Sequence, residues 1–241
     1  MIEKTFLEQH ATKIQTSLRN ILREYFQHLF LFNFYQAKGS EHFYFKGGTA
    51  LKLVFNSPRF SEDLDFSATK NSFVYEDTLQ EILIKIQREG IDCNLEESKK
   101  TTGGHLAIIE LAIYDERFEI KTEVSYRKRS LEGEKPIVIS DIFPSYTVNI
   151  LCSKNLIQEK QNALLERYKP RDLFDLYFIL RSDRLRRFLR IDDLFLNKTK
   201  KLLEKVELRQ VETEIKEFLP HPFWPVVKDL KKNLLSELRE L

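Results

Sequence analysis

Apolar residues recur at three- and four-residue steps through the first part of the chain, which is the spacing of a helix with one buried face. This stripe predicts one helical region from about Lys4 to Gln36, a scaffold helix whose end is expected to pack against the first strand. A second stripe predicts a helix from about Tyr75 to Arg88. Gly90 is expected to end it, because glycine readily adopts a positive φ after a helix.

Segments in which apolar and polar residues alternate predict strands. The predicted strands are an aromatic segment at Phe43–Phe45, one that carries Asp63–Phe66, and three later ones at Ile91–Glu96, His105–Tyr114 and Arg117–Tyr126. The short turn between the last two predicts that they pair as a hairpin.

From Ser153 onward the pattern is helical, and Pro170 begins another helix because proline is tolerated at the first helical position. This change predicts a domain boundary near residue 150, which separates a domain at 1–150 from one at 151–241. We therefore expect an α+β protein, in which a mixed β-sheet flanked by helices is followed by an all-helical C-terminal domain.

A glycine turn and two carboxylates lie close together early in the chain. Gly47 and Gly48 end the aromatic strand, and Thr49 is expected to cap the next helix, so backbone N–H groups at its start would favour an anion. Asp63 and Asp65 share one face of the following strand, because successive side chains alternate. Two adjacent carboxylates repel each other, and a divalent cation such as Mg²⁺ relieves that repulsion.

A third carboxylate, Glu123, lies in the strand predicted at Arg117–Tyr126, on the same face as Lys121. In a sheet this face could meet Asp63 and Asp65. Three acidic residues on adjacent strands beside a glycine turn form the arrangement that two-metal phosphoryl transfer needs, because the metals neutralise developing charge while the turn holds a triphosphate.

Composition changes this picture only a little. The formal net charge is +2 over 241 residues, so any nucleic-acid contact must come from local basic clusters. Cys93 and Cys152 lie in separate segments without metal-site spacing and fit a reducing compartment. There is no signal peptide and no apolar run long enough to span a bilayer, so we expect a soluble, cytoplasmic protein with no membrane partner.

Several groups of residues resemble the motifs of one family. They are Lys46-Gly-Gly-Thr-Ala-Leu-Lys-Leu53 with Arg59-Phe-Ser-Glu-Asp-Leu-Asp-Phe66, Ile120-Lys-Thr-Glu-Val-Ser125, Gln158-Glu-Lys160 with Ala163 and Arg167, and Arg171-Asp-Leu-Phe-Asp-Leu-Tyr177. Together they span roughly residues 43 to 180. They resemble the AbiEii/AbiGii toxin-type nucleotidyltransferases of the DNA polymerase β-like superfamily.

The resemblance implies a nucleotidyltransferase-type sheet with a helical C-terminal domain, dependence on Mg²⁺ or Mn²⁺, and transfer of a nucleotide from an NTP to a hydroxyl. The acceptor that it implies is RNA, at the 3′ end of tRNA. It also implies a toxin of a toxin–antitoxin or phage-defence system, with a separate antitoxin as a possible partner.

The resemblance further implies roles for individual residues. The implied metal ligands are Asp63, Asp65 and Glu123, which are also implied catalytic residues together with Lys160 and Asp172. The implied nucleotide-binding residues are Lys46, Gly47, Gly48, Thr49, Lys121, Arg171 and Asp175. Those from Lys160 onward would close the site from the helical domain.

Structural interpretations of the acidic residues in the sheet stay open. The Asp-x-Asp pair could consist of solvated strand-end acids that pair with Lys46 and Arg59. Glu123 could form a surface pair with Lys121 on its own strand.

The helical residues also have structural interpretations. Asp172 lies in a first helical turn, where the helix dipole favours a carboxylate. Asp175 falls four residues after Arg171 and could form a helical ion pair with it. Lys160 and Arg167 lie two turns apart, which is also the pattern of a solvated face.

Two further functions remain open beside transfer to RNA. The same core could transfer a nucleotide to a hydroxyl of a protein or small molecule. A non-catalytic module that binds nucleotide or a partner protein is the third possibility.

Overall fold

The computed structural model describes residues 2–69, 75–127 and 131–239. Its contacts divide the chain into two units: unit 1 is Met1–Asn56 with Phe60–Cys152, and unit 2 is Ser57–Arg59 with Ser153–Leu241. Three residues from early in the chain therefore belong to the unit formed by the C-terminal helices. Within the described ranges, no helix is long and apolar enough to cross a membrane.

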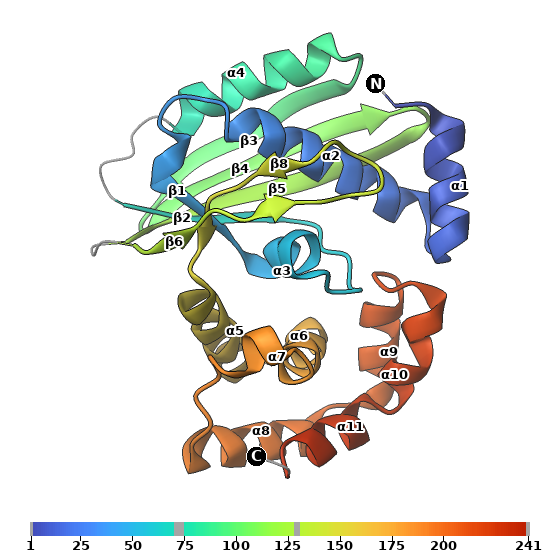
Figure 1. Cartoon of the computed structure of the whole chain (residues 1–241), viewed down its shortest axis with the longest axis vertical. Helices are drawn as coiled ribbons and strands as arrows, with labels where there is room; N and C mark the ends of the chain where they lie inside the picture. Colours follow the sequence, from blue (N-terminus) through green and yellow to red (C-terminus); the bar gives the residue numbers. More distant parts are fainter. Residues whose placement is uncertain (1, 70–74, 128–130, 240–241) are drawn as a thin grey trace. The chain divides into compact units, whose positions relative to one another are not determined.

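Unit 1 is built on a mixed sheet, which within the described residues has seven strands in the order β3-β4-β5-β2-β1-β9-β6 (Figure 1). β2 runs antiparallel to β1 and parallel to β5. A separate two-stranded sheet pairs β7 with β8. The strands are β1 (Phe43–Lys46), β2 (Leu64–Thr69), β3 (Asp92–Thr101), β4 (Gly104–Ile113), β5 (Glu116–Arg127), β6 (Gly133–Glu134), β7 (Ile137–Val138), β8 (Tyr146–Thr147) and β9 (Ile150–Leu151).

Aromatic rings join the central strands of unit 1 to two of its helices. Phe34 of α2 lies 4.9 Å from Phe66 of β2 and 5.4 Å from Phe43 of β1, measured between ring centroids. Tyr75 of α4 lies 5.6 Å from Phe43, and its hydroxyl donates to the hydroxyl of Thr122 in β5. Buried side chains of β1, β2 and β5 therefore face α2 and α4. The helices of unit 1 are α1 (Lys4–Ile14), α2 (Leu18–Phe34), α3 (Gly47–Phe55) and α4 (Tyr75–Arg88), with a 3₁₀ turn at Ser40–His42.

The first predicted helix is two helices. α1 and α2 are separated by Gln15, which adopts the left-handed conformation with φ 58°, and by Ser17, whose side chain accepts a hydrogen bond from the N–H of Asn20. The apolar stripe continues on both sides of this break, so periodicity alone did not reveal it. The helix predicted from Tyr75 to Arg88 is confirmed as α4.

The predicted hairpin is confirmed, because β4 and β5 pair antiparallel on either side of Tyr114, which has φ 54°. The strand before them is longer than predicted and continues to Thr101 instead of Glu96. A register shift between Leu95 and Glu97 interrupts the alternation on which the prediction depended.

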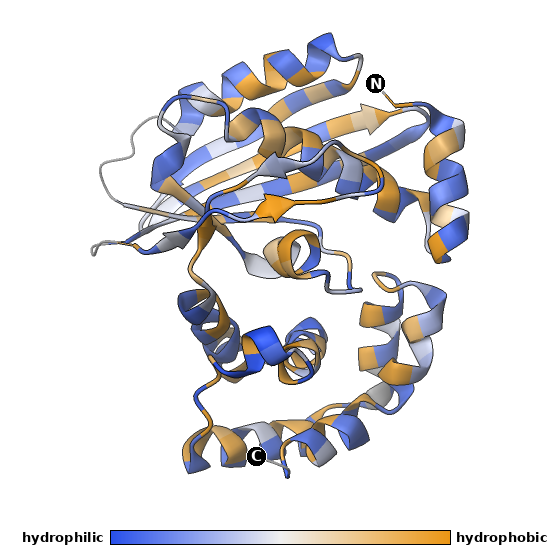
Figure 2. Ribbon diagram, viewed as in Figure 1, coloured by the Kyte–Doolittle hydropathy of each residue, from blue (hydrophilic) through white to orange (hydrophobic). Residues whose placement is uncertain are grey.

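Unit 2 is helical, and its central helix α6 contacts α5, α9 and α11. Pro170 stands at the start of α6, as predicted. Figure 2 shows hydrophobic and hydrophilic residues interleaved along these helices, as expected where each buries one face. Leu173 of α6 and Leu234 of α11 belong to the resulting core. The helices are α5 (Ser153–Arg167), α6 (Pro170–Leu180), α7 (Asp183–Arg186), α8 (Asp193–Lys205), α9 (Leu208–Lys216), α10 (Trp224–Lys228) and α11 (Leu230–Glu237), with a 3₁₀ turn at His221–Phe223.

Candidate active site

β1 runs directly into α3, with no loop between the strand and the helix. Lys46 is both the last residue of β1 and the N-cap of α3, and Gly47 begins the helix with φ +81°. The first N–H groups of a helix lack partners within the helix, and the helix dipole makes this end favourable for negative charge. The glycine turn is therefore a helix start that favours an anion.

Thr49 has a different local role from the predicted one. It lies inside α3, it is fully buried, and its hydroxyl donates a hydrogen bond to the backbone carbonyl of Asp63. The prediction that Thr49 is the N-cap is wrong, because that position belongs to Lys46, which makes no side-chain capping bond. Thr49 instead joins α3 to the segment that carries the acidic pair.

Strand register brings the sheet residues of the predicted site together. Lys46 lies opposite Asp65 across β1 and β2, and Asp65 lies beside Glu123 across β2 and β5. Phe66 is fully buried and faces α2, so the preceding Asp65 points to the other face of the sheet. Asp63 directly precedes β2 and, like Asp65, is partly exposed.

The carboxylate of Asp65 lies against the start of α3. A Cβ atom on Gly47 would lie 2.1 Å from Oδ2 of Asp65 and 2.9 Å from its Cγ, far closer than real carbon contacts allow. Only glycine leaves room for this approach. The contact joins the helix start and the acidic pair into one local arrangement.

Lys121 forms an ion pair with Glu123 on β5 and is close enough to Asp63 and Asp65 for their charges to act on it. Its Nζ is 2.8 Å from Oε2 of Glu123, with 43% and 48% of the two side chains exposed, so the surface pair left open by the sequence is present. The hydrogen bond to Glu123 raises the pKa of Lys121. Asp63 and Asp65 raise it further, against the opposing effect of burial. Lys121 is therefore a cation at neutral pH, and the negative charges of Asp63 and Asp65 stabilise its protonated form.

The donor set suits a magnesium site that substrate completes. Within the part of the chain that the structure describes, no group of three His, Cys, Asp or Glu side chains is gathered to hold a metal ion. Glu123 instead pairs with Lys121. Mg²⁺ is commonly held by one or two carboxylates together with substrate phosphates and water, which is the number that Asp63 and Asp65 offer.

Asp175 of α6 is buried in unit 2, where it accepts hydrogen bonds from two cations. Arg59 donates from Nε at 2.9 Å and from Nη2 at 3.0 Å, and Lys160 donates from Nζ at 2.8 Å. Burial alone would raise the pKa of Asp175, but the charges of Arg59 and Lys160 outweigh it and hold that pKa well below the usual range. The helical ion pair with Arg171 that the sequence left open is not the pair that the structure shows.

Asp172 is also buried and is held by Arg167, which donates from Nε at 2.8 Å and from Nη2 at 2.6 Å. The side chains of Lys160, Asp172 and Asp175 thus take part in ion pairs inside unit 2, while their catalytic or nucleotide-binding roles stay predictions. Arg171 differs from them, because within the described residues its buried Nε has no hydrogen-bond partner.

Arg59 is the residue whose contacts sequence reasoning missed. The sequence offered it only as a motif residue or as a partner of the Asp-x-Asp pair, whereas it is 4% exposed and belongs to unit 2. Its partner Asp175 lies 116 residues away, so no local spacing signals the pair. The residues around Arg59, from Asn56 to Asp63, are mostly polar, so the local sequence gives no signal that this arginine is buried.

An anion-favouring helix start beside an Asp-x-Asp strand, on a mixed sheet with a helical unit after it, defines the chain as a protein of the nucleotidyltransferase fold. A family model described as "Nucleotidyl transferase AbiEii toxin, Type IV TA system" matches residues 29–236. The chain belongs to this family and is therefore a nucleotidyltransferase, which confirms the family and fold that the sequence motifs predicted.

Solved structures share the fold. MenT4, a nucleotidyltransferase toxin from Mycobacterium tuberculosis, aligns with a TM-score of 0.64 at 18% sequence identity, over 100% of this chain and 91% of that chain. JHP933 from Helicobacter pylori aligns with a TM-score of 0.57 at 19% identity, over 93% of this chain and 95% of that chain. No curated protein matches the sequence significantly.

Gly47→Ala is expected to destabilise the protein and to lower nucleotidyl transfer. The left-handed backbone costs a non-glycine residue about 1–3 kcal/mol, and the added methyl group must also displace the Asp65 carboxylate. Urea unfolding and transfer rates measure the two effects. Gly90→Ala is the matched control, because Gly90 has φ +87° but no atom within 4 Å of the added Cβ. Equal losses in both variants would show that the contact with Asp65 is unimportant.

Proposed function

We propose that this toxin-family nucleotidyltransferase depends on a divalent metal and transfers a nucleotide from an NTP to a hydroxyl of RNA, at the 3′ end of tRNA. The observation that carries the proposal is the Asp65 carboxylate lying against the helix start at Gly47. A helix start favours phosphate, and a carboxylate beside it favours a cation bound to that phosphate. The two requirements of an NTP–magnesium complex are therefore met in one place.

The proposal gives each sheet residue a role. The N–H groups at Gly47 and Gly48 would hold triphosphate oxygens, and Asp63 and Asp65 would hold Mg²⁺. When bound, this ion would neutralise charge on the phosphate oxygens. Lys121, whose pKa the neighbouring carboxylates raise, would face the nucleotide phosphates.

The reaction itself is a displacement at phosphorus. The acceptor oxygen forms a bond to the α-phosphorus, the bond to the bridging oxygen breaks, pyrophosphate leaves, and the hydroxyl proton passes to solvent. The carboxylates and the helix start contribute by positioning and by electrostatic stabilisation. Glu123 would contribute by holding Lys121 in position through their ion pair.

The residues of the helical unit have their own proposed roles. Arg171 is proposed as a nucleotide-binding residue because it begins the motif Arg171-Asp-Leu-Phe-Asp-Leu-Tyr177 that resembles the family. Lys160, Asp172 and Asp175 are proposed to support the site through the ion pairs that they form within unit 2. An antitoxin encoded with this chain is the expected partner, in agreement with the type IV toxin–antitoxin description of the family.

Incorporation of labelled NTPs into tRNA tests the proposed function. The purified chain is expected to label unfractionated tRNA, and the label is expected to disappear with EDTA and to return with Mg²⁺ or Mn²⁺ in excess. RNase treatment separates the possible acceptors, because label on RNA is released while label on protein is not. Label that resists RNase, or incorporation that survives EDTA, would overturn the acceptor or the metal dependence respectively.

A further inference from the structure

α11 has one apolar face and one basic face. Leu230, Leu234 and Leu238 recur every four residues and are buried in the core of unit 2. Lys232 lies on the opposite, exposed side of the helix, whereas Lys231 lies at the edge of the apolar face and is partly buried. The apolar face packs α11 against the core of unit 2, and the lysine side chains remain accessible to a ligand.

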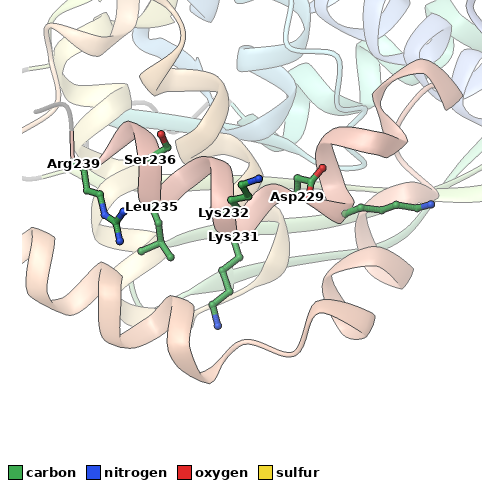
Figure 3. Close-up of a pocket in the computed structure, with 7 residues that line it drawn as sticks. Asp229, Lys231, Lys232, Leu235, Ser236 and Arg239 are labelled. Atoms are coloured by element: carbon green, nitrogen blue, oxygen red, sulfur yellow. The ribbon is translucent and has the colours of Figure 1, made fainter.

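An open hollow of about 510 Å³ follows the basic face (Figure 3). Four cationic side chains line it, Lys228, Lys231, Lys232 and Arg239, and Asp229 is the single carboxylate among its lining residues. We call this surface the basic groove. In Figure 3, Lys231, Leu235 and Arg239 project from the same side of α11.

Three of the four cations of the basic groove lack an acidic partner within the described residues, whereas the charge of Lys228 helps to lower the pKa of Glu212. Within the described residues, no ion pair involves Lys231, Lys232 or Arg239. The acid nearest to them on α11, Glu237, is instead bonded to Arg181 at 2.7 Å. Since the whole chain has a formal charge of only +2, the groove concentrates more positive charge than the entire sequence carries on balance.

We propose that the basic groove binds the phosphodiester backbone of RNA. This inference deepens the proposed function, because it rests on RNA as the acceptor. Lys231 lies on α11 and Arg239 lies two residues beyond its end on the same side, so the groove offers cations spaced along its length to the phosphates of one strand. Ser236 adds a hydroxyl donor, and the part of Leu235 that is not packed against the core of unit 2 adds a small apolar surface for a sugar or base.

The lining favours RNA over an acidic protein. Protein interfaces have cores rich in aromatic and aliphatic side chains and depleted in lysine. The basic groove has one large apolar side chain, Leu235, and three lysines. Phosphate contacts by lysine and arginine position a nucleic acid without reading its sequence, so the groove would orient the RNA and leave selection of the acceptor end to the catalytic site.

Binding of fluorescent unfractionated tRNA, measured by anisotropy without NTP, tests the basic groove. Lys231→Glu/Lys232→Glu is expected to weaken binding by about tenfold or more and to reduce the slope of log affinity against log salt by about 1.4–1.8. The matched control is Lys85→Glu/Arg88→Glu on α4, which makes the same charge change at exposed positions. Equal binding by the groove variant and wild type, or equal weakening by both variants, would overturn the proposal.

Two further arms keep this outcome separate from folding and from catalysis. Lys231→Gln/Lys232→Gln removes charge without reversing it and is expected to weaken binding less than the glutamate variant, with an unchanged circular dichroism spectrum. Asp65→Asn is expected to bind tRNA like wild type, so a failure of nucleotidyl transfer leaves the binding result intact. Competition by polyglutamate as effective as by unlabelled tRNA would identify an acidic polypeptide as the occupant and overturn the RNA assignment.

Discussion

Asp65→Asn is expected to lower nucleotidyl transfer at least about hundredfold while leaving the fold intact. Asparagine preserves the shape of the side chain that lies against Gly47, so the substitution removes the charge without removing the contact. Loss of the carboxylate that lies against the helix start removes one of the two proposed ligands of the metal–triphosphate complex. Initial rates of labelled nucleotide incorporation, together with a thermal unfolding scan, measure both parts of the prediction.

Asp92→Asn provides the matched control for this change. Asp92 is an exposed residue of β3, so the same loss of one negative charge there should leave the transfer rate near that of wild type. If Asp65→Asn retained wild-type activity at saturating Mg²⁺, the assignment of the acidic pair would be wrong. If both variants lost activity equally, the loss would come from overall charge.

Asp175→Asn is expected to destabilise the protein by about 3–5 kcal/mol. The amide fits the same space but removes the negative charge that Arg59 and Lys160 both contact, at a position where only 1% of the Asp175 side chain is exposed. Removing one member of a buried ion pair costs more than the pair contributes to stability, because the charge of the other member stays out of water without that compensation. Urea unfolding followed by far-UV circular dichroism measures the loss.

The pH dependence of this loss has a definite sign. The folded-state pKa of Asp175 lies below its ordinary value of 3.8, so its contribution is fully present above that value and is lost as the pH falls toward the folded pKa. The difference between wild type and Asp175→Asn should be constant from pH 8 to about 5 and should shrink below about 4. Glu237→Gln, at the exposed Arg181 pair, should cost less than about 1 kcal/mol. Similar costs for the two variants would contradict a special role for the buried cluster.

The parts of the fold that follow from local pattern were predictable. α4 has an apolar stripe, an acidic first turn and a following glycine, and its predicted bounds match the structure. α6 was predictable for a comparable reason, because Pro170 suits only the first turn of a helix. The break at Gln15 was not, since the stripe resumes in phase after it. Ser17 was the available signal, because serine is a preferred helix N-cap.

In the candidate site, too, the features that depend on local sequence were predictable and those that depend on long-range contacts were not. Asp-x-Asp after a glycine turn is a local pattern from which a shared face was predicted. β2 begins only at Leu64, so Asp63 lies just before the strand and the shared face stays a prediction. The contact of Asp65 with Gly47 depends on the register of β1 and β2, which the sequence does not specify. The use of the Thr49 hydroxyl depends on how the chain returns after α3. Pairings such as Arg59 with Asp175 arise only when distant segments fold together.

The membership of Ser57–Arg59 in unit 2 has a consequence for dissecting the protein. A fragment that begins at Ser153 would contain Asp175 and Lys160 but not Arg59, so its central helix would keep a buried carboxylate with half of its counter-charges. A fragment that ends at Cys152 would carry Arg59 without its partner Asp175. The gene therefore has no single position at which a cut yields two complete units, and a separately expressed helical unit would need the short segment around Arg59 supplied in addition.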